Sequence, residues 1–311
     1  MSSPPFLLET PCTSGMMMNM KANLTISAAL TLMACTLSAA ELHVKGGFLP
    51  GDVIDDRRLL SEINKTTEQL RKNGDTVKAV ELLEQLSRKK CGIQLMPSGK
   101  QRLSAAEIAA RSRKGVLVVS GLFKCKRCPN WHSGAASGFM LTSDGVFCTS
   151  YHVVDNQTNE TIVIMTGDGR VAPVEEVLAA DKTTDLAILR AKGKGFTALP
   201  VSTEAPLGSK VRVFSHPDKK FYVLSEGIIS RKYLDNTRDG GQRKMLSITA
   251  DFAKGSSGAP VFNEFGAVIA SVNNTQSTYY TEKNGVKDNL QMVFKNTVSM
   301  HHLLNMIEEK K

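Results

Sequence analysis

Three polar side chains in the second half of the chain are of the types that cooperate in nucleophilic catalysis. Ser257 lies in the stretch "DFAKGSSGAPVFN" (251–263), where four consecutive small residues predict a tight turn that presents a hydroxyl group. His152 ends the run "GVFCTSYH", and Asp185 comes just before the run "LAILRA". Because a serine hydroxyl is a weak nucleophile, it needs a neighbouring base and a third group that orients the base. The three residues therefore predict hydrolytic chemistry if the fold brings them together.

The elements that must position these residues are short and rich in β-forming side chains. From Gly115 onward, apolar runs alternate with Gly, Asp, Asn and Pro, which is typical of strands divided by tight turns. These runs predict an all-β fold, either a sandwich or a pair of barrels, followed by a helix over 299–309. The runs are "VLVVSGLF", "SGFMLT", "GVFCTS", "TIVIMT", "LAILRA", "KVRVFS", "FYVLSEGIIS", "KMLSITA", "APVFN", "GAVIASV" and "LQMVF".

Three longer blocks hold the histidine, the aspartate and the serine in that chain order: "SGFMLTSDGVFCTSYHVV", "TTDLAIL" and "GSSGAPVFNEFGAVIAS". They resemble the catalytic blocks of trypsin-like serine peptidases, and most of all those of the bacterial HtrA/Deg branch. The resemblance covers residues 113–305 and implies a chymotrypsin-like double β-barrel. It also implies an endopeptidase that acts on protein or peptide substrates through an acyl-enzyme, with no cofactor and no metal. The alternatives are a non-catalytic peptide-binding scaffold and a redox or metal-binding module.

The resemblance also implies a role for each residue of the three blocks. Ser257 would attack the scissile carbonyl, His152 would accept and return the proton, and Asp185 would orient the imidazole. The N–H groups of Gly255 and Ser257 would form the oxyanion hole. Gly255 and Gly258 would let the backbone fold tightly enough for those groups to converge.

The residues that would contact a substrate follow from the same resemblance. Asp251, six residues before the serine, stands at the offset of the acid that binds basic side chains in trypsin. Because HtrA-type loops are built differently, we expect a small or medium apolar preference instead. Ser271, Val272 and Asn273 are expected to line the substrate channel and to pair with the peptide backbone. Ala259 replaces the glycine usual in the family and could narrow the site. No PDZ module is expected after the peptidase domain.

Four cysteines remain outside the N-terminal leader, and three histidine or cysteine ligands are close in sequence. The stretch "CKRCPNWH" holds Cys125, Cys128 and His132, a spacing that could seed a zinc site with Cys148 or Cys91 as fourth ligand. An even number of cysteines in an exported chain favours two disulfides among Cys91, Cys125, Cys128 and Cys148, with zinc binding and redox activity left as alternatives.

The N-terminal residues 1–40 have the pattern of a secretory signal. The stretch "MKANLTISAALTLMACTLSAA" (Met20–Ala40) combines a lysine, an uncharged apolar run and a small-residue ending. Its apolar part, Leu24–Leu37, is shorter than the roughly 20 residues that span a bilayer. We therefore expect cleavage near the end of this stretch and a periplasmic or extracellular location. Lipid attachment at Cys35 is an alternative, and the methionine cluster before it leaves open that residues 1–15 are not translated.

Residues 41–112 are expected to form a helical extension ahead of a peptidase domain over 113–311. Apolar residues at three- and four-residue steps predict a helical hairpin over Asp55–Lys90, and Ser104 with Glu107 completes a capping-box pattern. We favour a packing role for these helices over regulation or assembly into a homo-oligomer.

The charge pattern says little about partners. The formal net charge is +9, but no basic stripe is interleaved with aromatic residues, so nucleic acid is not an expected partner. The histidines outside the motifs, His43, His216, His301 and His302, are expected to be exposed to solvent.

Overall fold

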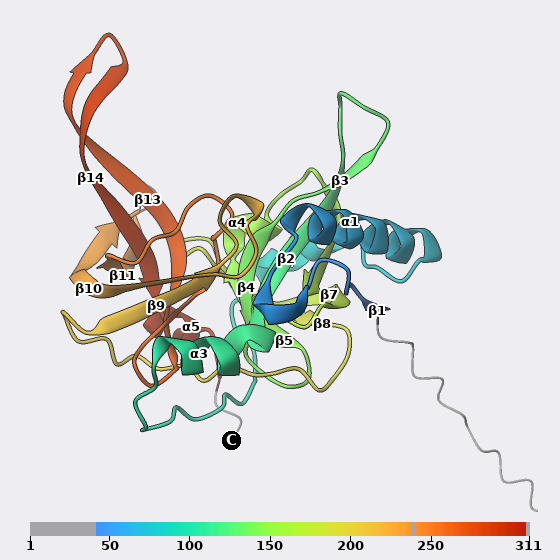
Figure 1. Ribbon diagram of the computed structural model, residues 1–311, viewed down its shortest axis with the longest axis horizontal. Coiled ribbons are helices and arrows are strands. Elements are labelled where there is room, and N and C mark those ends of the chain that lie inside the picture. Colours follow the sequence, from blue (N-terminus) through green and yellow to red (C-terminus); the bar gives the residue numbers. More distant parts are fainter. Residues whose placement is uncertain (1–41, 238–239, 309–311) are drawn as a thin grey trace, which may run out of the picture. The chain divides into compact units, whose positions relative to one another are not determined.

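The computed structural model describes residues 42–237 and 240–308 (Figure 1). The predicted signal segment 1–40, with Cys35, lies outside these residues. Strands dominate the described part, and they form two sheets that follow each other along the chain. No helix among the described residues is both long enough and apolar enough to cross a bilayer.

The first sheet is a barrel of six strands. Their order is β7-β6-β2-β4-β5-β8, and an additional antiparallel pairing of β7 with β8 joins the two ends. The short strands β1 (Leu42–His43) and β3 (Trp131–Ser133) add to β7 and β2. The barrel strands are β2 (Val116–Lys124), β4 (Ala136–Met140), β5 (Val146–Ser150), β6 (Asn159–Met165), β7 (Arg170–Asp181) and β8 (Leu186–Ala191).

The second sheet is a closed barrel in the order β10-β11-β14-β13-β12-β9. Strands β13 and β14 continue past the barrel as a two-stranded ribbon (Figure 1). The predicted all-β double barrel is therefore confirmed. The strands are β9 (Lys210–Ser215), β10 (Val223–Asn236), β11 (Gln242–Ile248), β12 (Pro260–Phe262), β13 (Val268–Lys283) and β14 (Val286–Ser299).

Each barrel has an apolar interior made by the predicted runs. Leu117, Phe147 and Leu189 are fully buried in the first, and Val261 and Ile269 are fully buried in the second. Burying one such side chain stabilises the fold by about 1.5–3 kcal/mol. The runs are continuously apolar because side chains on both faces of these strands are covered.

The N-terminal helices pack on the first barrel. Helix α1 (Asp56–Asn73) starts where the Asp55 carboxylate accepts the N–H of Arg58 and ends at Gly74, which has φ +77°. Its buried face holds Leu59 and Ile63, which join the core cluster that includes strands β2 and β4. Helix α2 (Ala79–Glu84) and a 3-10 turn (Gln85–Ser87) bury two leucines in a different cluster. The predicted hairpin is therefore two helices, each packed on the barrel.

Helices α3 (Ala105–Ser112) and α5 (His301–Asn305) are shorter than α1. Helix α3 begins with the predicted capping box, in which Ser104 and Glu107 satisfy each other's backbone N–H. The C-terminal helix α5 is shorter than predicted. It stops because Ile307 leaves the helix to form a bridge with Cys91.

Candidate active site

His152 and Asp185 form a tight pair on the first barrel. His152 stands on the one-turn helix α4 (Tyr151–Val154), directly after β5. Its Nδ1 lies 2.9 Å from Asp185 Oδ2, and its backbone N–H donates to Asp185 Oδ1 at 3.0 Å. The Asp185 side chain is 14% exposed and the His152 side chain is 53% exposed. With Nδ1 committed to the carboxylate, Nε2 is the nitrogen that can exchange a proton with another group.

The turn before β8 explains why Asp185 faces the imidazole. The Asp181 carboxylate accepts the N–H of Thr183 at 3.0 Å and the hydroxyl of Thr184 at 2.8 Å, which folds the "DKTTD" segment. Asp185 itself has φ +58°, a conformation that aspartate tolerates better than most residues. Its carbonyl accepts the N–H of Tyr151 at 3.1 Å, so the turn is attached to α4.

Asn273 on β13 holds the carboxylate from the second barrel. Its side-chain amide donates to Asp185 Oδ2 at 2.7 Å. Asp185 thus accepts hydrogen bonds from both barrels, and its hydrogen bond to His152 raises the pKa of the imidazole above its ordinary value. The side chain of Asn273, a predicted substrate contact, is thus engaged with Asp185, and its expected backbone pairing with a peptide stays a prediction.

The turn that carries Ser257 requires glycine at both flanking positions. Gly255 has φ +97° and Gly258 has φ +84°. A Cβ on Gly255 would lie 2.6 Å from the carbonyl oxygen of His216, and one on Gly258 would lie 2.4 Å from that of Ser137. Both contacts are with backbone, which cannot move aside easily. The small residues are therefore needed for close approach as well as for the turn.

Two backbone carbonyl groups of this turn accept hydrogen bonds from other segments of the chain. The Lys254 carbonyl accepts the N–H of Asp218 at 2.6 Å, and the Gly255 carbonyl accepts the Ser137 hydroxyl at 3.0 Å. Because N–H and C=O of a trans peptide point in opposite directions, the Gly255 N–H is directed away from Asp218. Within residues 42–237 and 240–308, neither Gly255 N–H nor Ser257 N–H has an acceptor. Two backbone donors beside Ser257 are thus available to an oxygen.

The two serines of the turn have different environments. The Ser256 hydroxyl is buried and donates to Ser215 Oγ at 3.0 Å, so it braces the turn. The Ser257 hydroxyl has no hydrogen-bond partner in the described part of the chain, and no bond joins it to His152. The Ser257 carbonyl accepts the N–H of Ser137 at 3.0 Å, which attaches the turn to β4 of the first barrel. The histidine, aspartate and serine therefore lie at the junction of the two barrels.

Part of the chain matches a known family. Residues 136–270 match the family model described as a trypsin-like peptidase domain. Over these residues the chain is similar to trypsin-like peptidases, among them serine endoproteases of the HtrA type.

Individual relatives cover part of the chain. The anti-sigma-I factor RsgI9 of Acetivibrio thermocellus is 29% identical over 136 residues, which are 43% of this chain and 18% of the relative. The serine endoprotease DegS of Haemophilus influenzae is 25% identical over 136 residues, or 43% of this chain and 39% of DegS. The chain thus spans less than half the length of these curated relatives.

A solved structure shows the same fold. The HtrA-type protease AlgW with a decapeptide superposes with a TM-score of 0.53 and 17% identity, covering 66% of each chain.

In the peptidase domain, Asp251 is not a buried acid at the bottom of a pocket. Its side chain is 88% exposed and lies 3.2 Å from Lys295 Nζ. Lys295 also donates to the carbonyl of Phe252 at 2.9 Å, so its position is fixed. Both residues line a cavity of about 270 Å³ next to β14. The Asp251 carboxylate therefore already has a cationic partner within the chain.

The other two predicted substrate contacts, Ser271 and Val272, lie on β13 within the second barrel. Ser271 is buried between β12 and β14. The Val272 N–H donates to the Ala259 carbonyl at 2.9 Å, and the Val272 carbonyl accepts the Gly258 N–H at 3.0 Å. These bonds tie the serine turn of the peptidase domain to β13, so the backbone of Val272 has no remaining group for a peptide.

His216 was predicted to be exposed, and that prediction is wrong. Its side chain is fully buried behind the serine turn, where its Nδ1 accepts the N–H of Tyr222 at 3.0 Å. Burial lowers the pKa of this histidine to about 3, so it is neutral at physiological pH. The segment folds inward because Asp218, Lys219 and Tyr222 adopt positive φ angles, which a proline-containing turn signal does not indicate. His43 and His301 are exposed as expected, and His302 is half-buried.

The structure shows neither of the two predicted disulfides: in residues 42–237 and 240–308, the four cysteines Cys91, Cys125, Cys128 and Cys148 are unpaired thiols. Cys148 is fully buried in the core of the peptidase domain, and Cys91 lies in the bridge to Ile307. Cys125 and Cys128 lie in the loop between β2 and β3. Their sulfur atoms and the ring of His132 are within 4.8 Å of one another, and neither Cys148 nor Cys91 joins them.

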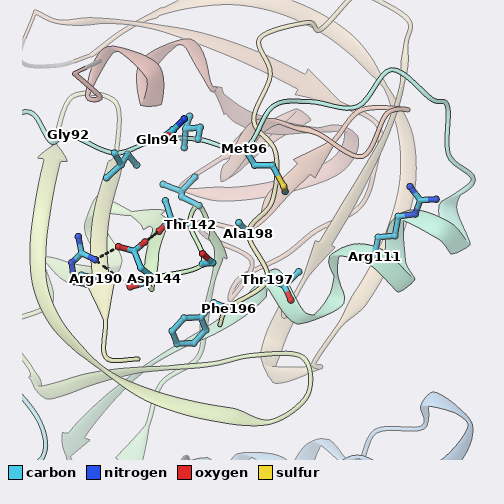
Figure 2. Close-up of a pocket in the computed structure, with 14 residues that line it drawn as sticks. Gly92, Gln94, Met96, Arg111, Thr142, Asp144, Arg190, Phe196, Thr197 and Ala198 are labelled. Carbon is cyan, nitrogen blue, oxygen red and sulfur yellow. Dashed lines mark hydrogen bonds and ion pairs between the residues drawn. The ribbon is translucent and has the colours of Figure 1, made fainter. Parts of the chain in front are cut away.

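A separate cavity of about 860 Å³ does not contain the candidate catalytic residues (Figure 2). It lies between the extended segment 92–96, the loop 141–144 and the segment 196–198. An ion pair of 2.8 Å between Arg190 and Asp144 lies at its edge. The candidate active site of the peptidase domain is therefore a surface site at the barrel junction and not this cavity.

Proposed function

We propose that this chain is a serine endopeptidase in which Ser257 is the nucleophile, His152 the general base and acid, and Asp185 the residue that orients His152. The observation that carries the proposal is the pairing of an oriented imidazole with a serine turn that has two available N–H donors. A binding scaffold has no need of these two features together. The match to the trypsin-like peptidase family supports the same chemistry.

The proposed reaction has two halves. Ser257 Oγ attacks the carbonyl carbon of the peptide bond while His152 Nε2 takes the hydroxyl proton, and the carbonyl oxygen becomes an oxyanion. Collapse of this intermediate breaks the C–N bond, and His152 returns the proton to the leaving amine. Water then attacks the acyl-enzyme in the same way, which releases the acid product and restores the serine.

The surrounding groups lower the barrier of each half. The N–H groups of Gly255 and Ser257 donate to the oxyanion, and one such donor contributes about 2.7–4 kcal/mol in related enzymes. Asp185 stabilises the imidazolium that forms when His152 takes the proton. Asn273 acts on Asp185 and is a positioning residue.

We further propose that the substrate is an extended segment of a protein chain cleaved after a small or medium apolar residue. Solved structures of the HtrA-type protease AlgW carry a decapeptide or a tripeptide. The ion pair of Asp251 with Lys295 argues against selection of basic residues.

The signal pattern in residues 20–40 supports export to the periplasm or the exterior. The peptidase domain of this proposal covers residues 113–311, with 41–112 as its helical extension.

Covalent labelling with a fluorophosphonate probe tests the proposal directly. The purified chain is expected to take up one probe molecule at Ser257, located by intact mass and peptide mapping. Ser257→Ala should abolish the labelling. Ser256→Ala is the matched control, because it removes the neighbouring hydroxyl, which faces Ser215 and not the site. Absence of labelling in folded protein would instead favour the peptide-binding scaffold.

A further inference from the structure

The loop between β2 and β3 gathers three metal-ligating side chains that the proposed peptidase mechanism does not use. Cys125, Cys128 and His132 come from the stretch "CKRCPNWH". Cys128 Sγ lies 3.0 Å from His132 Nε2, and all three ligand atoms lie within 4.8 Å of one another. A tetrahedral zinc ion with two sulfur ligands and one nitrogen ligand requires separations of about 3.6–3.8 Å between the ligand atoms. Small side-chain rotations therefore suffice to bring the three around one ion.

The backbone of the loop holds one of the two sulfur atoms in place. The N–H of Arg127 donates to Cys125 Sγ at 3.3 Å, a bond that stabilises negative charge on sulfur. Lys124, Lys126 and Arg127 add positive charge beside the two thiols. A zinc ion bound by two thiolates forms a group with no net charge. The three basic side chains therefore repel that group less than they would repel a free divalent cation.

The stem of the loop is fixed by helix α1. The Asn64 amide donates to the Trp131 carbonyl at 3.2 Å, and the Ser133 hydroxyl donates to Asn64 Oδ1 at 3.0 Å. The guanidinium of Arg71 lies 4.3 Å from the centre of the Trp131 ring. These contacts hold the chain on both sides of His132. The third ligand is thus positioned before any ion binds, which lowers the entropy lost on binding.

The surroundings supply no fourth protein ligand. Among the described residues, no other histidine, cysteine or carboxylate joins the three. A cavity of about 440 Å³ adjoins Cys125 and His132, and its remaining walls include Arg57, Ser61 and Lys219 but no acidic residue. This cavity gives solvent access to the cluster. A cation bound there would complete its coordination with water.

We propose that Cys125, Cys128 and His132 bind a zinc ion with water as the fourth ligand. Soft thiolate donors together with imidazole select zinc over magnesium or calcium. The ion would close the loop between β2 and β3, which otherwise has no covalent or ionic link across it among the described residues.

The site is independent of the proposed peptidase activity, and its test uses metal as the probe. The full chain, without a polyhistidine tag, is purified in the presence of zinc, and bound metal is measured by plasma mass spectrometry. We expect one zinc per chain in the wild-type protein and in Ser257→Ala. Cobalt added to the reduced, metal-free protein should give the near-ultraviolet thiolate charge-transfer band and intense visible bands of a tetrahedral site.

Trp131 offers a second readout, because it is the only tryptophan of the chain and precedes His132 directly. Its fluorescence should change on zinc titration and report the affinity. Cys128→Ser and His132→Ala each remove a direct ligand. Since loss of an outer partner alone weakens metal binding about 10–100-fold, these variants should weaken it by more than about 100-fold. Cys91→Ser is the matched control and should bind zinc like the wild type.

Two results would overturn the inference. One is a wild-type chain that is purified without metal and lacks two hydrogens in its intact mass because Cys125 and Cys128 form a disulfide. The other is zinc binding that survives in Cys128→Ser, or that is lost equally in Cys91→Ser. Circular dichroism of each variant, with fluorophosphonate labelling where the wild type reacts, distinguishes loss of the site from loss of the fold.

Discussion

Replacing Gly255 with alanine tests whether the serine turn needs glycine for close packing against the backbone of other segments, and not only for its positive φ angle. Alanine at a positive φ costs about 1–2 kcal/mol wherever it occurs. At Gly255 the new Cβ would also lie 2.6 Å from the carbonyl of His216 and 3.2 Å from the N–H of Asp218. The turn must therefore shift, and the Gly255 N–H would leave the place at which the proposed mechanism puts the oxyanion. Loss of one such donor lowers the rate of the chemical step by about 10²–10³.

Gly208→Ala is the control for the strain itself. Gly208 has φ +81°, but a Cβ there would meet nothing within 4 Å. Strain of about 1–2 kcal/mol corresponds to a loss of about 2–8 °C in Tm for a domain of this size. We expect that loss in Gly208→Ala, at least as large a loss in Gly255→Ala, and a slower reaction in Gly255→Ala alone.

The assay is the second-order rate of fluorophosphonate labelling at a temperature well below both Tm values. The phosphonyl oxygen of the probe occupies the same position as the oxyanion, so the rate reports both donors. If folded Gly255→Ala is labelled as fast as Gly208→Ala, then the Gly255 N–H is not an oxyanion donor and the assignment of the turn is wrong.

Three further predictions follow from the described contacts. Asp185→Asn should leave the fold intact but slow peptide hydrolysis by about 10⁴, because the amide can donate to Nδ1 and hold the imidazole in the wrong tautomer; near wild-type hydrolysis would exclude the triad. The hydrogen bond from Asp185 raises the pKa of His152, and the base must be neutral, so activity should be lost as the pH falls through a midpoint above the ordinary histidine value; a pH–rate profile measures this midpoint. Leu59→Ala should destabilise the chain by about 2–5 kcal/mol in denaturant unfolding, because Leu59 is fully buried between α1 and the barrel. Exposed Leu207→Ala should change stability by less than about 0.5 kcal/mol.

Local sequence patterns predicted most of the strands but missed β7. The segment Arg170–Asp181 contains Pro173 and two adjacent glutamates, which interrupt the hydrophobic alternation. The structure accommodates them with register shifts against β8, and Glu176 pairs with Arg88 and Arg190. Bulges and distant ion pairs are tertiary features, so they leave no periodic signal in the strand itself.

The candidate site was predictable where its contacts belong to recognisable blocks. The resemblance of the three blocks to peptidase sequences predicted that His152 pairs with Asp185, and the two side chains are hydrogen-bonded in the structure. The bond from Asn273 to Asp185 and the bond from Asp218 to Lys254 join segments far apart in the chain, and neither has a local motif. His216 was assigned to the surface from its turn signal, because burial depends on which elements cover a turn and not on the turn itself.

The ribbon of β13 and β14 beyond the second barrel has a consequence for local unfolding. Its outer residues, from Asn274 to Gln291, are exposed on both faces, including Tyr280 at 78% and Val286 at 68%. A two-stranded ribbon with no packed face is only marginally stable by itself. Its amide protons should therefore exchange with deuterium through frequent local opening, while those of the barrel strands exchange only through far rarer events. Along β13 and β14, the exchange rate of the backbone amides should therefore be high in the ribbon and low in the barrel. The rate should change at the point where the two strands enter the barrel.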